Sequence, residues 1–280
     1  MKAFTKLPIE ELKNIAKNIR KEILKMLAEA GSGHTGGSLG LADIFTTLYF
    51  EILNHNPKNP TWEKRDRLIL SIGHVAPVLY ATLAMAGYFK ISELKTLRKL
   101  GSRLQGHPAK NYGLPGIETS SGSLGQGLSI AVGLALAAKI DKQKWQTYCI
   151  MGDGEQQEGS IWEAAMSAAH YKLNNLTAII DRNGLQIDGK TSQVMEIEPL
   201  ANKWKAFNWN VIQCNGHDYI DIITALQKAK KYIKGPSIII AKTIMGKGVK
   251  SIENDHTWHG KAPSKEELKK FLIELEYNNN

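Results

Sequence analysis

Short apolar runs alternate with helical patterns in the second half of the chain. The apolar runs are TYCIM, LTAIID, WNVIQC and PSIIIAKTI, and the helical stretches between the members of each pair are SIWEAAMSAAHY and DIITALQKAKKYI. Such alternation is typical of parallel strands joined by crossover helices. The sequence therefore predicts an α/β fold, with a largely parallel sheet flanked by helices on both faces.

The first half of the chain is predicted to be mainly helical. Apolar residues recur at helical spacing over residues 8–30, and Gly31 supplies a stop signal. The stretches LADIFTTLYFEIL and APVLYATLAMAGYF indicate further helices, with the short run LILSI between them as a buried strand. Residues 123–140 are apolar nearly all round, which predicts a helix buried in the core or at a subunit interface.

The length and composition suit one globular unit. The chain has 280 residues, of which 42% are hydrophobic, so it can bury a full core. Repeats and low-complexity linkers are absent from the sequence. We expect a single domain over residues 1–280, with an N-terminal helix at about 8–30 and a frayed tail at 277–280.

The two cysteines, Cys149 and Cys214, both lie within apolar stretches. They form neither a disulfide framework nor a metal motif, so buried free thiols in a reducing compartment are the better interpretation. The segment MKAFTKLPIEELKN lacks the apolar core of a signal peptide, and apolar runs fall short of the roughly eighteen residues that a membrane span needs. These features favour a cytoplasmic protein without a membrane partner.

The basic charge has two interpretations. The formal net charge is +9, but the excess is spread over helical faces such as KNIRKEILK, which is typical of a solvated surface. The sequence shows no helix-turn-helix pattern, aromatic RNA-binding motif or basic tail. We therefore expect no nucleic-acid partner, whereas anionic substrates remain compatible with the charge.

Several familiar motifs are matched only superficially. The segment GSGHTG at 31–36 fits the dinucleotide pattern GxGxxG, but it follows a predicted helix where that motif requires a strand. His256 and His259 lack a third zinc ligand nearby. The segments SSGSLGQG and MGKGV match neither a nucleophile elbow nor a phosphate-binding P-loop.

Polar side chains follow two successive strands of the predicted sheet. Asp153 follows TYCIM, and Asn183 lies in DRNG after LTAIID. Carboxylate, amide and backbone carbonyl oxygens at the carboxyl ends of parallel strands suit Mg²⁺ carrying a diphosphate. Gly154 permits phosphate oxygens to approach the backbone, and the next helix offers free N–H groups. Each segment alone could be a simple turn; together they predict a thiamine diphosphate site.

The chain resembles the N-terminal, diphosphate-binding domain of transketolases from about residue 8 to residue 263. The blocks that carry the resemblance, in the order found in that family, are SGHTGGSLG, LSIGHVAPVLY, GHPAKNYGLPGIETSSGSLGQG, MGDGEQQEGSIWEAA, DRNGLQIDG and WHGKAP. The resemblance implies the thiamine-diphosphate-binding fold.

The resemblance also implies roles for individual residues. Asp153, Asn183 and the backbone carbonyl of Leu185 would bind Mg²⁺, with Gly154 against the diphosphate. The cofactor contacts implied are those of His74 and His259 with the phosphates, and of Gly122, Ser123 and Leu124 with the aminopyrimidine. His34, His107 and His259 would face the hydroxyl groups of the donor sugar and shuttle protons. Glu158 would link the two thiazolium sites of a dimer, although it could equally be a carboxylate favoured by a helix N-terminus.

Structural roles compete with functional ones at each of these positions. His34, His74, His107 and His259 have glycine neighbours, which permit close ligand approach and favour function. The histidines expected only to pack or to lie at the surface are His55, His170 and His217. We expect Glu155 to be solvated or to cap a helix, and Trp162 to lie in the core.

The sequence departs from the family pattern at a few positions. Thr35 and Ser123 stand where the family usually has proline, which leaves the shape of the donor site open. Leu185 replaces an isoleucine, a neutral change because the implied contact is a backbone carbonyl.

The resemblance covers roughly the first half of whole transketolases. The part beyond it supplies a pyrimidine-binding domain and the glutamate that acts on the cofactor's pyrimidine ring. We therefore expect the N-terminal subunit of a split transketolase, active in two-carbon transfer between phosphosugars with a separate C-terminal subunit, in an α2β2 heterotetramer.

Two alternatives stay open. A subunit of another thiamine diphosphate enzyme, such as a 2-oxo acid dehydrogenase or deoxyxylulose phosphate synthase, would explain Asp153 and Asn183 but not the GHP and WHG blocks. A non-catalytic basic binding protein would not require Asp153, Asn183 and the glycine-flanked histidines together.

Overall fold

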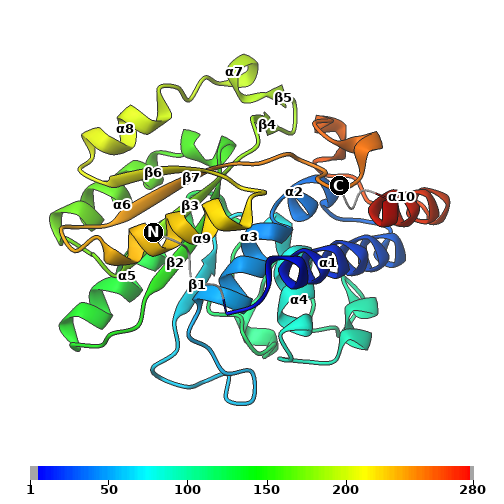
Figure 1. The fold of residues 1–280 in the computed structure, drawn as a ribbon, viewed down its shortest axis with the longest axis horizontal. Coiled ribbons are helices and arrows are strands. Elements are labelled where there is room, and N and C mark those ends of the chain that lie inside the picture. Colours follow the sequence, from blue (N-terminus) through cyan, green and yellow to red (C-terminus); the bar gives the residue numbers. More distant parts are fainter. Residues whose placement is uncertain (1–5, 278–280) are drawn as a thin grey trace.

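The protein is built around a parallel sheet, as a computed structural model that describes residues 6–277 shows (Figure 1). The five strands lie in the order β1-β2-β3-β7-β6, and all neighbours in that order are parallel. Their bounds are Arg67–Leu70 (β1), Thr147–Gly152 (β2), Leu176–Arg182 (β3), Asn210–Asn215 (β6) and Ser237–Lys242 (β7). The predicted parallel sheet is confirmed.

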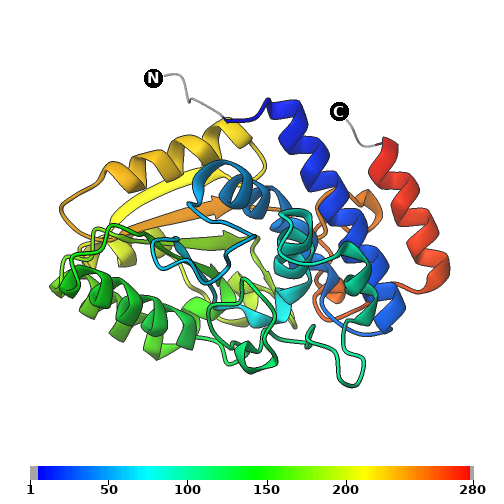
Figure 2. The same cartoon turned by 90° about the horizontal axis from the view of Figure 1, so that it is seen from below.

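Helices cover both faces of the sheet, as predicted (Figure 2). One face packs against α5 (Gln126–Ile140), α6 (Gly159–His170) and α8 (Leu200–Ala206), and the other against α1 (Ile9–Ala30), α3 (Ala42–Thr47), α4 (Ala76–Met85) and α9 (Tyr219–Lys231). Successive residues of β2 point to opposite faces, so Tyr148 and Ile150 belong to one core and Cys149 and Met151 to the other. This alternation explains why the strand reads as a continuous apolar run.

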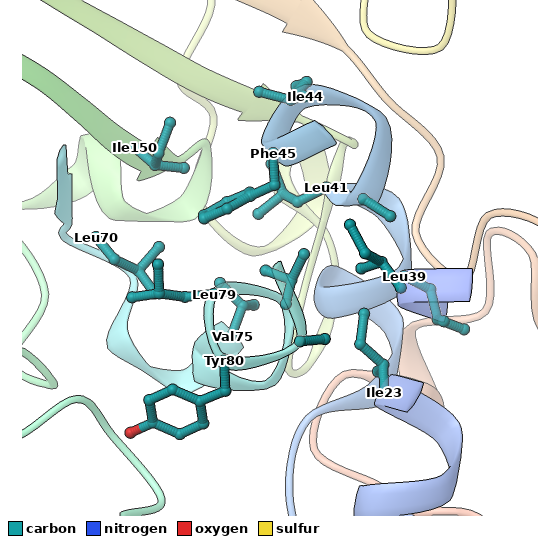
Figure 3. Close-up of a cluster of buried hydrophobic side chains, with 14 of the residues drawn as sticks. Ile23, Leu39, Leu41, Ile44, Phe45, Leu70, Val75, Leu79, Tyr80 and Ile150 are labelled. Carbon is teal, nitrogen blue, oxygen red and sulfur yellow. The ribbon is translucent and has the colours of Figure 1, made fainter. Parts of the chain in front are cut away.

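The N-terminal helices close the larger core beside β1 and β2. Helix α1 ends at Gly31, whose φ of 66° is left-handed and whose N–H donates to the carbonyl of Leu27. In Figure 3, Phe45 of α3 and Leu79 of α4 lie toward Leu70 of β1 and Ile150 of β2. This packing holds the turns that follow α1 and β1 close to the carboxyl edge of the sheet.

Helix α5 has one buried and one uncovered face. Leu128, Ala131 and Ala135 are buried against the sheet, whereas Ile130 and Ile140 are 36% and 69% exposed. The prediction that this helix is buried holds for one face, and the outer face is free for an interface.

Helix α10 (Lys265–Tyr277) was not predicted from the sequence. Phe271 and Leu275 bury it in the same core cluster as α1. Tyr277, the first residue of the predicted frayed tail, ends this helix, and the rest of that tail, 278–280, lies outside the described residues. None of the helices in residues 6–277 is long and apolar enough to cross a membrane.

The remaining elements are short. They are α2 (Thr35–Gly40), a π-helical turn (Leu48–Ile52), 3₁₀ turns (Gly73–Val75, Ile91–Thr96, Lys110–Tyr112, Gly154–Gln157, Lys250–Ile252 and His256–Trp258), the antiparallel pair β4 (Leu185–Gln186) and β5 (Gly189–Lys190), and α7 (Thr191–Val194).

Candidate active site

A cavity of about 300 Å³ lies at the carboxyl edge of the sheet, beyond β2 and β3. Sequence-predicted residues supply much of its lining: His34, His74, Gly122, Leu124, Asp153, Gly154, Glu158, Asn183, Leu185 and His259. They come from loops and turns far apart in the sequence, and the parallel strands bring them to one edge.

Asp153 follows β2 directly and is 2% exposed. Its Oδ1 accepts a hydrogen bond from the N–H of Gly154 at 2.8 Å, and its Oδ2 accepts from the N–H of Gly184 at 2.6 Å. The Arg182 guanidinium donates to the same Oδ2 at 3.0 Å. Burial raises the pKa of Asp153, and these donors oppose that shift. The carboxylate is thus held in one orientation.

Asp181 lies at the carboxyl end of β3, and Asn183 directly follows that strand. The amide nitrogen of Asn183 donates to Asp181 Oδ2 at 3.0 Å, and its Oδ1 accepts from the N–H of Leu185 at 2.9 Å. Asp181 is buried and also accepts from the hydroxyl of Thr243. Burial raises the pKa of Asp181 to about 7. These contacts fix the Asn183 side chain, whose Oδ1 keeps a second lone pair.

The donor types at this edge fit a hard divalent cation. The described residues contain no group of three or more His, Cys, Asp or Glu side chains placed to hold a metal ion. What Asp153, Asn183 and Leu185 offer is a carboxylate, an amide oxygen and a backbone carbonyl, all oxygen donors of the kind Mg²⁺ takes with phosphates completing its shell. The residues therefore fit Mg²⁺ bound together with a diphosphate.

Three histidines, His34, His74 and His259, line the cavity, and His107 lies beside them. The ring centroids of His34 and His74 are 5.0 Å apart, and those of His74 and His259 are also 5.0 Å apart. His107 lies farther out, at 6.4 Å from His34, and is exposed. His34 Nδ1 is buried and has no hydrogen-bond partner among the described residues. An unsatisfied ring nitrogen at a cavity is suited to a bound polar ligand.

Burial and mutual proximity keep these histidines neutral. Burial, together with the charges of His259 and Arg98, lowers the pKa of His34 from 6.5 to about 4. Burial, with the charges of His259 and His34, lowers the pKa of His74 to about 3. The pKa values of His107 and His259 are also lowered, mainly by burial. At neutral pH each ring offers one donor and one acceptor nitrogen.

Two predicted site residues, Ser123 and His107, are not among the residues that line the cavity, whereas Glu158 lines it from an exposed position. Ser123 is exposed and lines a separate hollow with Ser121 and Gln126. Glu158 is exposed at the N-cap position of α6 and makes no capping hydrogen bond with its side chain.

The expectation that Glu155 is solvated or caps a helix was wrong. Glu155 is 2% exposed and accepts hydrogen bonds from Ser71, Gly125 and Gly152. Its glycine-rich, acidic surroundings suggested solvent, but Ser71 and Gly125, which help to bury it, are distant in sequence.

The other structural assignments agree with the predictions. Trp162 is half-buried and packs against the α5–α6 core cluster. His170 is exposed, and His55 hydrogen-bonds the carbonyl of Tyr49. His217 bonds Asp43, away from the cavity.

Arg98 is a candidate that sequence reasoning missed. A Cβ built on Gly106 would lie 2.7 Å from the Arg98 guanidinium carbon, and the charge of Arg98 lowers the pKa values of His34 and His107. A lone arginine in a polar loop gives no signal, although the adjacent GHP block could have drawn attention to it. Asp181 and Arg182 lie in the DRNG segment at the end of β3 and were missed because their contacts with Thr243 and Asp153 arise only in the fold.

Comparisons with known proteins agree with this geometry. Residues 12–280 match the family described as transketolase, thiamine diphosphate binding domain. The chain is 43% identical to one subunit of the apulose-4-phosphate transketolase of Phocaeicola vulgatus, over 95% of this chain and 94% of that protein. It is also 43% identical to a 6-deoxy-6-sulfo-D-fructose transketolase subunit of a Clostridium species, over 95% of this chain and 96% of that protein.

A solved structure shows the same fold within a longer protein. The transketolase of Campylobacter jejuni superposes with a TM-score of 0.91 at 38% identity, over 98% of this chain. The match covers 44% of that transketolase, so the chain spans less than half the length of the solved protein.

Proposed function

This chain belongs to the transketolase family, and on that premise we propose that it is the cofactor-binding subunit of a split transketolase. With a separate C-terminal subunit it would transfer a two-carbon glycolaldehyde unit from a ketose phosphate to an aldose phosphate, as in the pentose phosphate pathway. The observation that carries this proposal is that His34, His74 and His259 line one cavity together with Asp153 and Asn183, with His107 beside His34.

The residues proposed to hold the cofactor are those at the sheet edge. Asp153, Asn183 and the carbonyl of Leu185 would bind Mg²⁺. Gly154, His74 and His259 are proposed to contact the diphosphate, Gly122, Ser123 and Leu124 the aminopyrimidine, and Glu158 the link to a second site. When bound, thiamine diphosphate supplies the carbon nucleophile needed to break and form a carbon–carbon bond.

His34, His107 and His259 are proposed to handle the protons of the sugar hydroxyl groups. Their lowered pKa values leave them neutral near pH 7, so each ring has one nitrogen that can accept a proton and one that can donate. The unpartnered Nδ1 of His34 supports this role because a substrate hydroxyl group would satisfy it. Arg98, next to His34 and His107, would attract the phosphate group of the substrate.

A partner subunit is proposed to complete the site. The relatives that match this chain over most of their length are named as subunits, which supports a separate partner. We propose that the partner supplies the pyrimidine-binding domain and its glutamate, in an α2β2 heterotetramer. The uncovered apolar face of α5 is the proposed contact surface, because Ile130 and Ile140 are exposed on it.

We propose a cytoplasmic location for this enzyme and a single domain for this chain. Cys149 and Cys214 are free and buried, which suits a reducing compartment.

The test is the rate of two-carbon transfer from xylulose 5-phosphate to ribose 5-phosphate, with thiamine diphosphate and Mg²⁺. Separate assays are run on this chain, on a candidate C-terminal subunit, and on their mixture. Further donors are apulose 4-phosphate and 6-deoxy-6-sulfofructose. We expect turnover only in the mixture, abolished by chelating the metal ion.

Other outcomes would contradict the proposal. Full turnover by this chain alone would remove the need for a partner. Pyruvate as the only donor would indicate a different thiamine diphosphate enzyme. A melting temperature raised by nucleic acid, and not by cofactor and Mg²⁺ in the mixture, would favour a non-catalytic binding protein.

A further inference from the structure

The carboxylate of Glu155 joins segments that meet at the candidate cavity. Its Oε1 accepts from the N–H of Gly125 at 2.7 Å and from the hydroxyl of Ser71. Its Oε2 accepts from the N–H of Gly152 at 3.1 Å. All partners are donors, so an ionised carboxylate satisfies them together.

Ser71 extends this connection. Its hydroxyl donates to Glu155 and also accepts from the N–H of Gly127 at 3.1 Å. We call the hydrogen bonds that Glu155 and Ser71 make with one another and with Gly125, Gly127 and Gly152 the Glu155 junction. Ser71 and Gly127 are also packed in direct contact, because a Cβ built on Gly127 would lie 2.4 Å from the Cβ of Ser71. The start of α5 therefore cannot shift relative to the end of β1 without breaking this junction.

The joined segments are those that carry the proposed cofactor contacts. Ser71 precedes the turn that holds His74, and Gly125 follows the segment 122–124. Gly152 precedes Asp153 and Gly154. A single buried side chain thus sets the spacing between the diphosphate-binding turn, the pyrimidine-contacting segment and a phosphate-contacting histidine.

We propose that Glu155, which also lines the cavity, is a positioning residue for thiamine diphosphate and acts with Ser71 through the hydrogen bonds of its carboxylate. The inference rests on the proposed function. Hydrogen bonds to the segments that contact a ligand hold those segments in place, and small displacements of the contacting groups weaken ligand binding.

A second buried carboxylate supplies a matched control. Asp66 is 8% exposed and accepts backbone hydrogen bonds from Asn54 at 2.9 Å and Gln146 at 2.8 Å. It precedes β1, so it lies at the opposite edge of the sheet from the cavity. Asp66→Asn therefore removes the same kind of interaction away from the site.

The experiment titrates thiamine diphosphate, at fixed Mg²⁺, into the enzyme assembled from this chain and its partner subunit. We expect Glu155→Gln to weaken binding about tenfold or more, because its amide group meets a backbone N–H where an acceptor is needed. Ser71→Ala should weaken it about three- to tenfold. The double variant should lose less than the product of the two factors, because both changes break one junction.

Asp66→Asn should lower the melting temperature about as much as Glu155→Gln does. It should leave the affinity for thiamine diphosphate within about twofold of that of the unaltered enzyme, since Asp66 is distant from the cavity. At saturating cofactor, Glu155→Gln should recover most of its kcat, which a globally disrupted enzyme would not do. If Glu155→Gln fails to fold, Ser71→Ala carries the same test.

Two results would overturn the inference in distinguishable ways. Equal affinities in the Glu155→Gln, Ser71→Ala and unaltered enzymes would contradict the positioning role alone. Failure of the unaltered assembly to bind thiamine diphosphate would overturn the proposed function and this inference with it.

Discussion

His217 differs from the four histidines of the candidate site in how completely its ring nitrogens are hydrogen-bonded. His217 Nδ1 lies 2.8 Å from Asp43 Oδ2, and its Nε2 accepts from the N–H of Ile244 at 2.9 Å. Asp43 is in turn paired with the buried guanidinium of Arg20. No ring nitrogen of His34, His74, His107 or His259 makes a hydrogen bond within residues 6–277.

The difference separates a structural role from a functional one better than burial does. Burial alone would not distinguish His74 from His217, because both are only partly exposed. A ring with both nitrogens bonded has no capacity left for a ligand, whereas an open ring at a cavity does. The closed network of Arg20, Asp43 and His217 fixes α1 and α3 against the loop after β7, and the open group remains available for chemistry.

The largest effect is expected from His34→Gln. Loss of a proton-transferring imidazole should reduce two-carbon transfer on the order of 10²–10⁴-fold. The melting temperature should stay within about 2 °C of the unaltered enzyme, because no hydrogen bond of the His34 ring is lost. Assays of turnover and thermal unfolding on the same preparation check both. Activity within about threefold of that of the unaltered enzyme would contradict a catalytic role for His34.

His217→Phe should produce the opposite pattern. The change leaves the N–H of Ile244 without a partner and removes one contact of Asp43, so the free energy of unfolding should fall by about 1–3 kcal/mol. Activity per folded molecule should remain within about threefold. Denaturant unfolding with an active-site titration measures both quantities. A severe loss of activity without destabilisation would show that the closed network also serves catalysis.

The smallest effect concerns pH. The pKa of His74 is lowered from 6.5 to about 3, so the unfolded chain binds a proton at higher pH than the folded chain does. The free energy of unfolding is therefore not reduced by His74 above pH 6.5, and it falls as the pH drops from 6.5 toward 3, because protons bind the unfolded chain first. Between about pH 7 and pH 5 the loss should be about 1–2 kcal/mol.

His74→Gln should remove that part of the acid sensitivity. Unfolding of the cofactor-free chain at about pH 7 and pH 5 gives the difference for each protein. An equal loss of unfolding free energy between the two pH values in both proteins would contradict the lowered pKa of His74.

The sequence was informative wherever local pattern decides structure. The apolar runs around α6 and α9 predicted β2, β3, β6 and β7, because buried parallel strands are recognisable by composition. The insertion of β7 between β3 and β6 was not predicted, since strand order depends on long-range packing. Asp153 and Asn183 were assigned to one edge because the carboxyl ends of parallel strands meet there.

The interpretation failed where distant residues set the environment. Glu155 owes its burial to Ser71 and Gly125, which are 84 and 30 positions away. Helix α10 was missed because few of its residues are buried, and the two that are, Phe271 and Leu275, join the core that contains α1. The contacts of Arg182 with Asp153 could not be read from DRNG, since only the fold brings them together.

The uncovered side of α5 affects how this protein must be made. Ile130, Ile140 and, on the adjacent α6, Met166 at 62% exposure present apolar surface to water. A newly synthesised copy in excess over the proposed partner subunit would tend to self-associate and would be recognised as an unassembled chain by chaperones and proteases. If the proposed two-subunit enzyme forms, balanced synthesis of both subunits would therefore limit the amount of working enzyme, and overproducing this chain alone would yield aggregate before activity.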